Sequence, residues 1–321
     1  LGGVLSVIAV ASLIMGIQAL PNGFSTSMGL LFATALVAGV LFFWRQKRAP
    51  RPLVDLDAAS VPTFWVAALA GTITFGSLMG ALFLGAQFTQ NVLGYDSLKA
   101  ALMTLPMSLM LIIISPFAGR MVQARGSRVT LAFGLVVVAV GFIIMIVTWH
   151  EGASVFVVLL SYAVVGAGVG ACATPAAHAL MASLPVSRAG MGSAFTDLTR
   201  DFGGAIMQAI MGTLLAVVYA NYFRNAFANL PPQEAANLSQ EAAEQMVGSY
   251  QGAEQVAQSY PQASAERVIA AANEAFTEGK SVAYILALVL TLFALVLVLW
   301  KYPRRAQERA FFAQMQAQSA A

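Results

Sequence analysis

The chain alternates long apolar stretches with short polar breaks along most of its length. A helix that crosses a bilayer needs about 20 mostly apolar residues. Stretches of about that length recur eight times, and the breaks between them carry turn-forming residues such as Gly, Pro, Asn and Ser. The pattern predicts an all-α, polytopic membrane protein with eight transmembrane helices. These helices are expected over residues 2–20, 24–44, 64–90, 101–119, 130–149, 154–181, 194–222 and 281–301.

One long break, residues 223–280, is too polar to be a further span. It holds seven glutamates and many Gln, Asn and Ser residues. Ala- and Glu-rich runs at 233–247 and 264–278 predict two short helices. The segment is either a solvated hairpin or an element that gates transport or contacts substrate.

Basic residues are distributed unequally between the two sets of breaks. Twelve of the 17 Lys and Arg residues fall in alternate breaks and after the last span, against four in the other set. Because short cytoplasmic loops carry an excess of Lys and Arg, the distribution predicts a multi-pass protein of the plasma (inner) membrane with a cytoplasmic C-terminus. The residues on the predicted cytoplasmic side are Arg45, Lys47, Arg48, Arg51, Arg120, Arg125, Arg128, Arg188, Lys301, Arg304, Arg305 and Arg309.

Composition excludes several classes of function. Hydrophobic residues make up 59% of the chain and charged residues 10%, with a mean hydropathy of +0.77. The net charge of +3 is small, and the basic residues are distributed by side of the membrane, so nucleic-acid binding is not expected. Cys172 is the single cysteine, and only His150 and His178 add imidazoles, so no disulfide, metal site or cofactor is expected. An enzyme is not expected because no nucleophile, base and orienting group stand out. Without a G-x-x-x-x-G-K-[ST] loop, the energy would come from an ion gradient or from a partner.

A polar stripe begins the 194–222 span. Asp197, Arg200 and Asp201 share one face of a helix, and Gly204 and Gln208 continue that face. An ionisable side chain inside hydrocarbon costs at least ~2.5 kcal/mol, so it normally faces a protein or water-filled interior. Two interpretations are open: an ion pair that closes the cytoplasmic end of the bundle, or carboxylates that bind a proton or a cation.

A second stripe lies on the 64–90 span. Phe75, Met79 and Phe83 share one face, and Gln87 and Gln90 extend it. Aromatic and Met side chains suit a lipophilic cation, so these residues, together with Gln208, are substrate-cavity candidates. The alternative for the apolar members is a surface that packs against lipid or another helix.

The stretch 119-GRMVQARGSR-128 resembles a cytoplasmic loop of the major facilitator superfamily, the loop between the second and third helices of each half, with the form G-x-L-x-D-x-x-G-x-[RK]. Gly119, Met121, Gly126 and Arg128 match, whereas Gln123 stands where the family usually has Asp. The resemblance implies a gating loop built on Gly119, Gly126 and Arg128. The departure at Gln123 weakens the expected charge network.

Three further stretches resemble the 14-span drug:proton antiporters of that superfamily, in the branch that exports quaternary ammonium compounds and other drugs. They are 87-QFTQNVLGYDSLKAALMTLP-106, 166-GAGVGACATPAAHALMASLP-185 and 189-AGMGSAFTDLTRDFGGAIMQAIMG-212. The resemblance implies two accessory helices in 1–48, a cytoplasmic linker in 49–63, a C-terminal six-helix bundle in 64–302 that includes an extracytoplasmic loop in 223–280, and a cytoplasmic tail in 303–321. The first residue, Leu1, stands inside an apolar run without an initiator Met, so an N-terminal six-helix bundle is expected to precede this chain.

The same resemblance implies proton-coupled efflux of amphipathic or cationic drugs by alternating access. Antiporters of this kind place acidic residues at this part of this helix, which assigns coupling to Asp201 and Asp197 beside Arg200. The expected partners are small amphipathic or cationic molecules, membrane lipid and the N-terminal bundle. Two alternatives are open: a non-transporting fragment or assembly module, because alternating access needs both halves, or an exporter of a different metabolite in the same superfamily.

Overall fold

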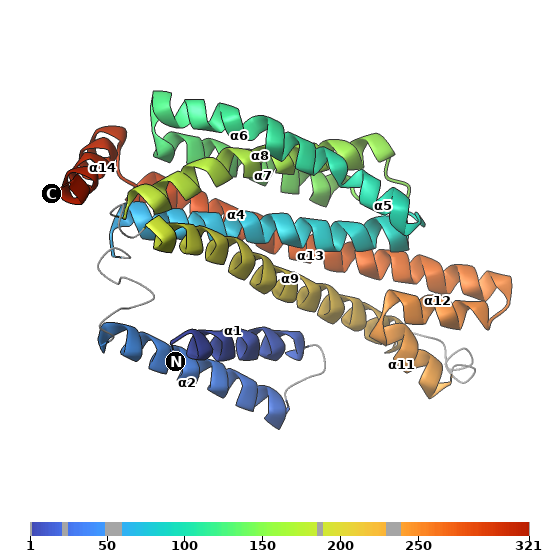
Figure 1. Ribbon diagram of the computed structural model, residues 1–321. Coiled ribbons are helices and arrows are strands. Elements are labelled where there is room, and N and C mark those ends of the chain that lie inside the picture. Colours follow the sequence, from blue (N-terminus) through green and yellow to red (C-terminus); the bar gives the residue numbers. More distant parts are fainter. Residues whose placement is uncertain (1, 21–24, 49–59, 185–188, 229–238, 321) are drawn as a thin grey trace.

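The computed structural model describes residues 2–20, 25–48, 60–184, 189–228 and 239–320, and every regular element in these ranges is helical (Figure 1). The expected all-α class is therefore confirmed. The helices are α1 (Gly2–Gln18), α2 (Thr26–Arg48), α4 (Pro62–Gln87), η2 (Phe88–Val92, a π-helix), α5 (Ser97–Met103), α6 (Leu105–Arg125), α7 (Ser127–Thr148), α8 (Val155–Ala182), α9 (Ala189–Ala228), α11 (Gln240–Gly248), α12 (Tyr250–Gln258), α13 (Gln262–Lys301) and α14 (Arg305–Ala320).

Seven segments of the described chain are long and apolar enough to cross a membrane, so the expected count of eight is not confirmed. The difference lies in α1, which has 17 residues. At about 1.5 Å per residue such a helix rises about 26 Å, less than the hydrocarbon thickness of about 30 Å. The other seven expected spans each coincide with a long apolar helix or helix pair.

The long helices pack side by side, with α4, α6, α7, α8, α9 and α13 together and the α1–α2 pair against α9 (Figure 1). The Thr213 hydroxyl of α9 donates to the Ile17 carbonyl of α1 at 3.0 Å. Helices α11 and α12 lie at one end of the bundle and α14 at the other (Figure 1). Arg128, at the start of α7, donates to the carbonyl of Leu299 near the end of α13. The basic residues of the α6–α7 junction and those after α13 therefore lie at the same end of the bundle as α14.

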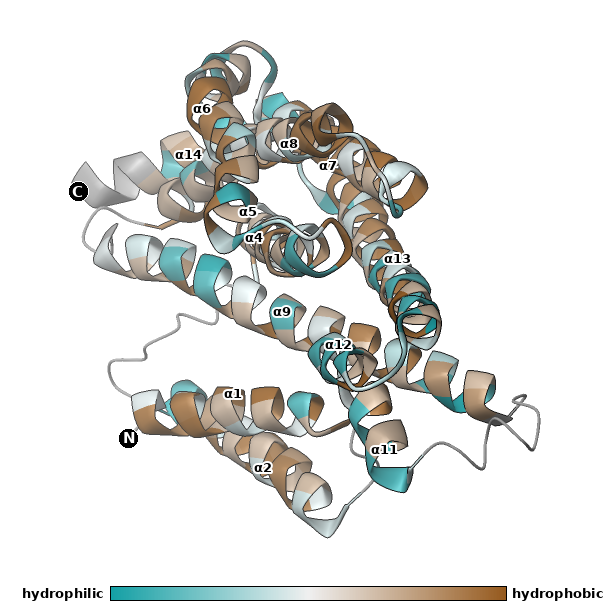
Figure 2. Cartoon of the chain, turned by 90° about the vertical axis from the view of Figure 1, so that its right-hand side faces the viewer, coloured by the Kyte–Doolittle hydropathy of each residue, from teal (hydrophilic) through white to brown (hydrophobic). Residues whose placement is uncertain are grey.

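The polar segment 223–280 differs from the expected pair of short helices. Helix α9 runs to Ala228, residues 229–238 lie outside the described ranges, and the second expected helix forms the first half of the 40-residue α13. No proline separates that half from the apolar half, and Gly279 between them packs closely against Leu215 of α9, so the helix continues. Figure 2 shows the hydrophilic character of α11 and α12, but Met246, Ala253 and Val256 on these helices are buried, so the segment packs onto the bundle.

Helices α4 and α9 approach closely where each has a glycine. A Cβ at Gly76 would lie 2.7 Å from the Gly203 carbonyl oxygen, and a Cβ at Gly203 would collide with the Thr72 carbonyl oxygen. Small residues allow such backbone approach in membrane helices. The two glycines therefore bring α4 and α9 together.

We expect Gly203→Ala to destabilise the protein by about 1–3 kcal/mol, because the added methyl meets backbone, which cannot rotate away. Thermal unfolding in detergent measures the effect. The matched control is Gly39→Ala on α2, where a Cβ meets nothing within 4 Å. Equal melting temperatures for the two variants would contradict the close contact.

Candidate functional site

The polar stripe lies near the start of α9. Asp197, Arg200 and Asp201 are exposed, Gln208 is partly buried and Gly204 is buried. Figure 2 shows that hydrophilic and hydrophobic positions alternate along α9. The helix thus carries two carboxylates on a surface that the described helices leave open.

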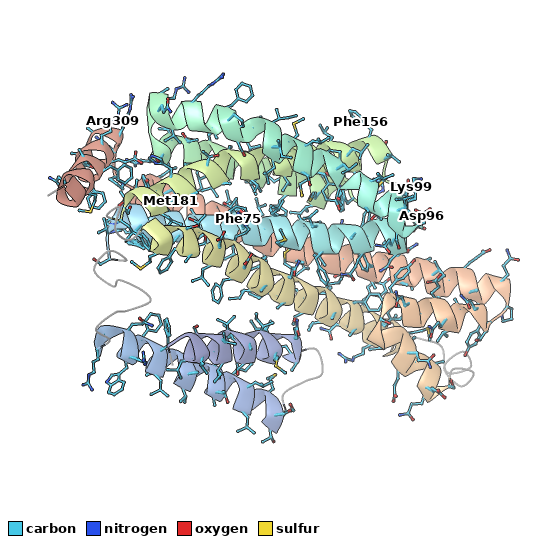
Figure 3. The ribbon with its side chains drawn as sticks, in the orientation of Figure 1. Phe75, Asp96, Lys99, Phe156, Met181 and Arg309 are labelled. Carbon is cyan, nitrogen blue, oxygen red and sulfur yellow. The ribbon has the colours of Figure 1, made fainter. Side chains whose placement is uncertain are left out.

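The structure brings the two expected stripes together. The guanidinium carbon of Arg200 lies 5.4 Å from the centre of the Phe75 ring. A Cβ at Gly204 would lie 2.9 Å from Met79 Cγ, and one at Gly212 would lie 3.1 Å from Phe83 Cε1. We call this line of contact the α4–α9 seam. Phe75, labelled in Figure 3, lies between α4 and α9.

The ion pair, which is one of the two interpretations of the stripe, is absent from the described residues. Among the described residues no salt bridge joins Arg200 to Asp197 or Asp201, and Arg200 contacts the Phe75 ring instead. A cation over an aromatic face is stabilised by about 0.5–1 kcal/mol at an exposed site. The carboxylates of Asp197 and Asp201 therefore have no protein cation that neutralises them within the described chain.

A cavity of 220 Å³ opens beside this contact, between α4, α8 and α9. Phe75, Thr174, Thr196, Thr199 and Arg200 are among its lining residues. The three threonine hydroxyls already donate to backbone carbonyls, at 2.8–3.3 Å. The hydroxyls can still accept hydrogen bonds, and Arg200 is the lining side chain named here that can still donate them.

A second cavity, of 400 Å³, lies at the far end of the seam. It gathers three of the expected cavity residues, Phe83, Gln87 and Gln90, and adds residues of α9, α12 and α13. We call it the hairpin cavity because α11 and α12 contribute to it. Sequence reasoning missed Tyr219, Tyr250, Gln251 and Phe276 here. For Tyr250 and Phe276 the only signal is that aromatic residues recur in a polar segment.

Asp96 and Lys99 mark the same end of the molecule (Figure 3). The Asp96 side chain accepts a hydrogen bond from the Lys99 backbone amide at 2.7 Å and thereby caps α5. The Lys99 ammonium lies 3.5 Å from the centre of the Tyr95 ring. Both residues act in local structure and not in the hairpin cavity.

The expected cytoplasmic gating loop over residues 119–128 is mostly helix. Gly119 lies in α6, which continues to Arg125, and Arg128 lies in the first turn of α7. Only Gly126, with φ of 87°, separates the two helices. A non-glycine residue rarely adopts that conformation, so a single glycine makes the turn.

The tail helix α14 docks on this junction through Glu308, a residue that the sequence did not single out. Glu308 is 3% exposed; its carboxylate accepts from the Ser127 amide at 3.2 Å and from the Tyr302 hydroxyl at 3.0 Å. Burial, and then the charge of Glu308, raise the pKa of the Tyr302 hydroxyl above its usual range, so it remains a donor. The carboxylate stabilises the N-terminus of α7. In the sequence, Glu308 could have been noticed because it is the single acidic residue in a basic tail.

Two arginines of α14 complete the contact. Arg305 and Arg309 both donate to the Gln123 carbonyl, at 2.8 and 3.2 Å. The rings of His178 on α8 and Phe312 on α14 lie 5.5 Å apart. The tail helix therefore contacts α6, α7 and α8. The two arginines bind the backbone carbonyl of Gln123 and not its side chain.

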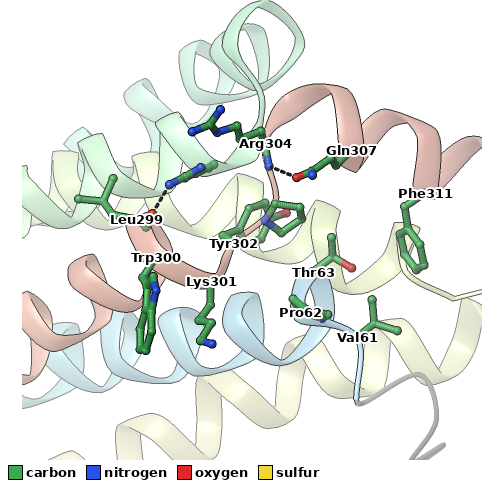
Figure 4. A pocket seen from close by; sticks show the side chains of 12 residues that line it. Val61, Pro62, Thr63, Leu299, Trp300, Lys301, Tyr302, Arg304, Gln307 and Phe311 are labelled. Carbon is green, nitrogen blue, oxygen red and sulfur yellow. Dashed lines mark hydrogen bonds between the residues drawn. The ribbon is translucent and has the colours of Figure 1, made fainter.

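Arg128 lies in a third cavity, of 760 Å³, between the start of α4, the end of α13 and α14 (Figure 4). Its guanidinium donates to the Leu299 carbonyl. Figure 4 shows Lys301 and Arg304 pointing to different sides of this cavity, so its basic groups do not converge. Within the described part of the chain, no three His, Cys, Asp or Glu residues could hold a metal ion together.

The sequence profile of the Major Facilitator Superfamily matches residues 1–208 of the chain. The multidrug efflux pump LfrA of Mycolicibacterium smegmatis is 31% identical over 281 residues, which cover 86% of this chain and 53% of LfrA. The multidrug resistance protein Stp of Mycobacterium tuberculosis is 32% identical over 217 residues, which cover 67% of this chain and 40% of Stp. The chain spans about half the length of the curated relatives it matches.

Solved structures share the fold. A bacterial homologue of the human lysosomal transporter Spinster, in an inward-facing and unoccupied conformation, aligns with a TM-score of 0.55 at 13% identity. The alignment covers 92% of this chain and 62% of that one. At this identity the likeness concerns the arrangement of helices alone.

Replacing Glu308 tests the docking of α14. In Glu308→Gln the amide nitrogen cannot accept a hydrogen bond, so we expect the contact with the Ser127 amide or the Tyr302 hydroxyl to weaken by about 1–3 kcal/mol. Hydrogen exchange of the Ser127 amide and of α14 measures the loss. The control is Glu266→Gln, an exposed glutamate on α13 that accepts from Gln262. Unchanged exchange in Glu308→Gln would contradict the role of the carboxylate.

Proposed function

Because this chain belongs to the Major Facilitator Superfamily, we propose that it forms part of a proton-coupled transporter that exports amphipathic or cationic compounds by alternating access. Its relatives LfrA and Stp are named as a multidrug efflux pump and a multidrug resistance protein, which supports this substrate class. The seven apolar helices are those of a multi-pass membrane protein. The basic residues gathered at the α14 end support a cytoplasmic position for that end in the plasma (inner) membrane.

The α4–α9 seam is the observation that carries the proposal. It places Phe75 and Met79 beside a helix face on which Asp197 and Asp201 are exposed and without a salt bridge among the described residues. Aromatic rings and Met provide adaptable apolar contacts for a flat cation. The carboxylates provide the opposite charge on the same side of the bundle.

Competition at a carboxylate would couple the two fluxes. An ionised Asp201 attracts a cationic compound, whereas a protonated Asp201 does not, so one carboxylate cannot hold a proton and a cation together. Entry of a proton from one side of the membrane would then release the compound.

Alternating access requires a second bundle that faces the exposed carboxylates. In this proposal Asp197, Asp201 and Gln208 line the space between the two bundles, and the described chain supplies one wall of it. Cavities between two helical bundles are where secondary transporters bind substrate. The second bundle and membrane lipid are thus the proposed partners of this chain.

Asp201→Asn tests the coupling role in the full-length protein. Ethidium efflux from energised cells or proteoliposomes is expected to fall at least about tenfold and to lose its dependence on the pH gradient, because an amide cannot exchange a proton. Asp197→Asn, measured in parallel, shows which carboxylate couples.

Asp96→Asn is the matched control, because Asn retains the cap on α5 and because α5 lies at the opposite end of the bundle from the start of α9 (Figure 1). Its efflux is expected to equal that of the wild type. Unchanged, gradient-dependent efflux in both Asp201→Asn and Asp197→Asn would refute the carboxylate mechanism. Export of an uncharged metabolite without any export of cations would refute the substrate class.

A further inference from the structure

Lys280 is a basic residue buried inside the helix bundle. It lies on α13, immediately before the apolar stretch 281–301, and its side chain is 0% exposed. The other lysines of the described chain, Lys47, Lys99 and Lys301, are exposed. Lysine is almost never fully buried without a paired charge, and ionisable residues inside membrane proteins mark functional positions. Lys280 is therefore a candidate for a role of its own.

The side-chain nitrogen of Lys280 contacts groups that attract a cation but carry no full charge. It donates a hydrogen bond to the carbonyl of Trp149, which ends α7. It also lies 5.1 Å from the centre of the Phe88 ring in η2. Carbonyls at a helix C-terminus and the faces of aromatic rings attract cations, although more weakly than a carboxylate does. Lys280 thus joins α13 to α7 and to η2.

Aromatic rings surround this contact. Trp149 stacks on Phe88 with centroids 4.9 Å apart, and its ring lies 5.3 Å from that of Tyr162 and 5.9 Å from that of Tyr284. All four residues are at most 1% exposed. Rings replace the hydration of a charge only in part, so this pocket accommodates a neutral amine better than an ammonium.

No carboxylate among the described residues forms a salt bridge with Lys280. The acids on the elements around this part of α13 are all exposed, and they are Glu151, Glu254, Glu274 and Glu278. The other titratable or basic residues there are His150, Tyr162, Tyr219, Tyr222, Arg224, Tyr250 and Tyr284, whereas α4 and η2 have none. Glu151 accepts from Asn273, and Glu274 accepts from Tyr222. Lys280 therefore has no buried counter-ion in the described chain.

The burial of this group sets the direction in which a proton acts. In the closed arrangement of this structure an ammonium is removed from water without a counter-ion, which costs free energy that a neutral amine does not cost. A neutral amine still has an N–H that can donate to the Trp149 carbonyl. An arrangement that admits water to Lys280 instead favours the ammonium. Proton uptake by Lys280 therefore favours the open arrangement, and the effect grows as the pH falls.

Exposed residues lie next to the two partners. Glu278 precedes Lys280 by two positions, and His150 directly follows Trp149. Helices α11 and α12 lie at this end of the bundle, opposite to α14 (Figure 1). In the proposed orientation this end faces away from the cytoplasm, so a separation of α13 from the end of α7 would admit water and protons from outside.

We propose that Lys280 is a second proton-binding site of the transporter, which takes up its proton when α13 separates from the end of α7. The proton adds to the lone pair of the side-chain nitrogen, and the resulting ammonium leaves the Trp149 carbonyl for water. Loss of the proton lets the neutral amine return. The titration of Lys280 does not depend on export, but its place in a transport cycle rests on the proposed function.

The separation would also change the hairpin cavity. Phe88 begins η2, and Gln87 and Gln90 on either side of it line that cavity. A side chain of Lys280 that moves into water leaves the Phe88 ring and removes a contact that holds this turn. A π-helix is a rare element that occurs frequently at functional sites. Proton binding at Lys280 and the shape of the cavity are therefore linked.

The fluorescence of Trp149 measures the separation. In the full-length protein in nanodiscs, the other tryptophans, which include Trp44, Trp65 and Trp300, are replaced by Phe. Emission is recorded between about pH 9 and about pH 5, below the pKa of an ordinary lysine. Because Trp149 is buried in the closed arrangement, we expect its emission to shift to longer wavelength, and its quenching by acrylamide to increase, as the pH falls.

Lys280→Met removes the proton site and leaves an unbranched apolar side chain in its place. We expect the pH-dependent shift to be lost and the melting temperature to stay the same or rise, because a buried group without a counter-ion is removed. Lys280→Arg remains charged throughout this pH range, so its emission is expected at long wavelength at every pH. A purely structural tie predicts that Lys280→Met lowers the melting temperature and that Lys280→Arg restores it. That pattern would overturn the inference, and Lys280→Met alone decides if the arginine variant does not fold.

Three variants at the same end of the bundle are controls. Lys99→Met removes an exposed lysine, and His150→Gln and Glu278→Gln remove exposed groups that titrate within or near this pH range. Each is expected to keep the shift of the Trp149 emission. A shift that disappears in His150→Gln and persists in Lys280→Met would assign the titration to His150 and overturn the inference.

The result is separable from the test of the carboxylates. Loss of the shift in Lys280→Met, together with unchanged efflux in both Asp201→Asn and Asp197→Asn, would support the proton site and refute the carboxylate mechanism. No shift in the protein with Lys280 intact, together with lost efflux in Asp201→Asn, would overturn the proton site and leave the proposed function in place.

Discussion

The close approach of α4 to α9 is the constraint on which the candidate site depends. Gly76 and Gly203 let the two backbones meet where any larger side chain would collide. This contact fixes the register of the two helices, so Phe75 lies opposite Arg200 and Phe83 lies opposite Gly212. Because no driving force from water exclusion acts between helices in lipid, such close packing is what holds these two stripes together.

The register also divides α9 into faces with different roles. Thr199, Gly203 and Met207 are buried, whereas Asp197 and Asp201 remain exposed. A helix that placed the carboxylates against α4 would bury two charges without a partner, at a cost of several kcal/mol each. Packing of the glycine face against α4 thus leaves the acidic face for a partner outside the described chain.

The ends of the bundle are closed by polar groups that come from distant parts of the sequence. At one end, Glu308 of the tail reaches the start of α7, and at the other, Asn273 links α12 to Glu151. In both places a side chain satisfies groups that helix ends or buried turns would otherwise leave unpaired. The tail and the polar segment before the last helix are therefore structural parts of the bundle as well as appendages to it.

Sequence reasoning succeeded where the signal is periodic and local. The apolar stretches predicted helices at the right places because a span must satisfy its own backbone hydrogen bonds, whatever surrounds it. The stripe from Asp197 to Gln208 and the stripe from Phe75 to Phe83 follow from helix geometry in the same way. Errors arose at the ends of elements: α6 absorbs most of the expected 119–128 loop, and α13 absorbs a helix expected to be separate.

By itself, the sequence determined the all-α membrane class, the position of the apolar helices and the membership of each helical stripe, since these depend on composition and on the 3.6-residue period. Only the tertiary structure decided that the two stripes meet, that Arg200 contacts Phe75 and not a carboxylate, and that α12 walls a cavity with Tyr219. It also revealed Glu308 as the group that docks the tail. The physical reason is that these contacts join residues far apart in the chain, and the packing of whole helices, which no local pattern encodes, sets their register.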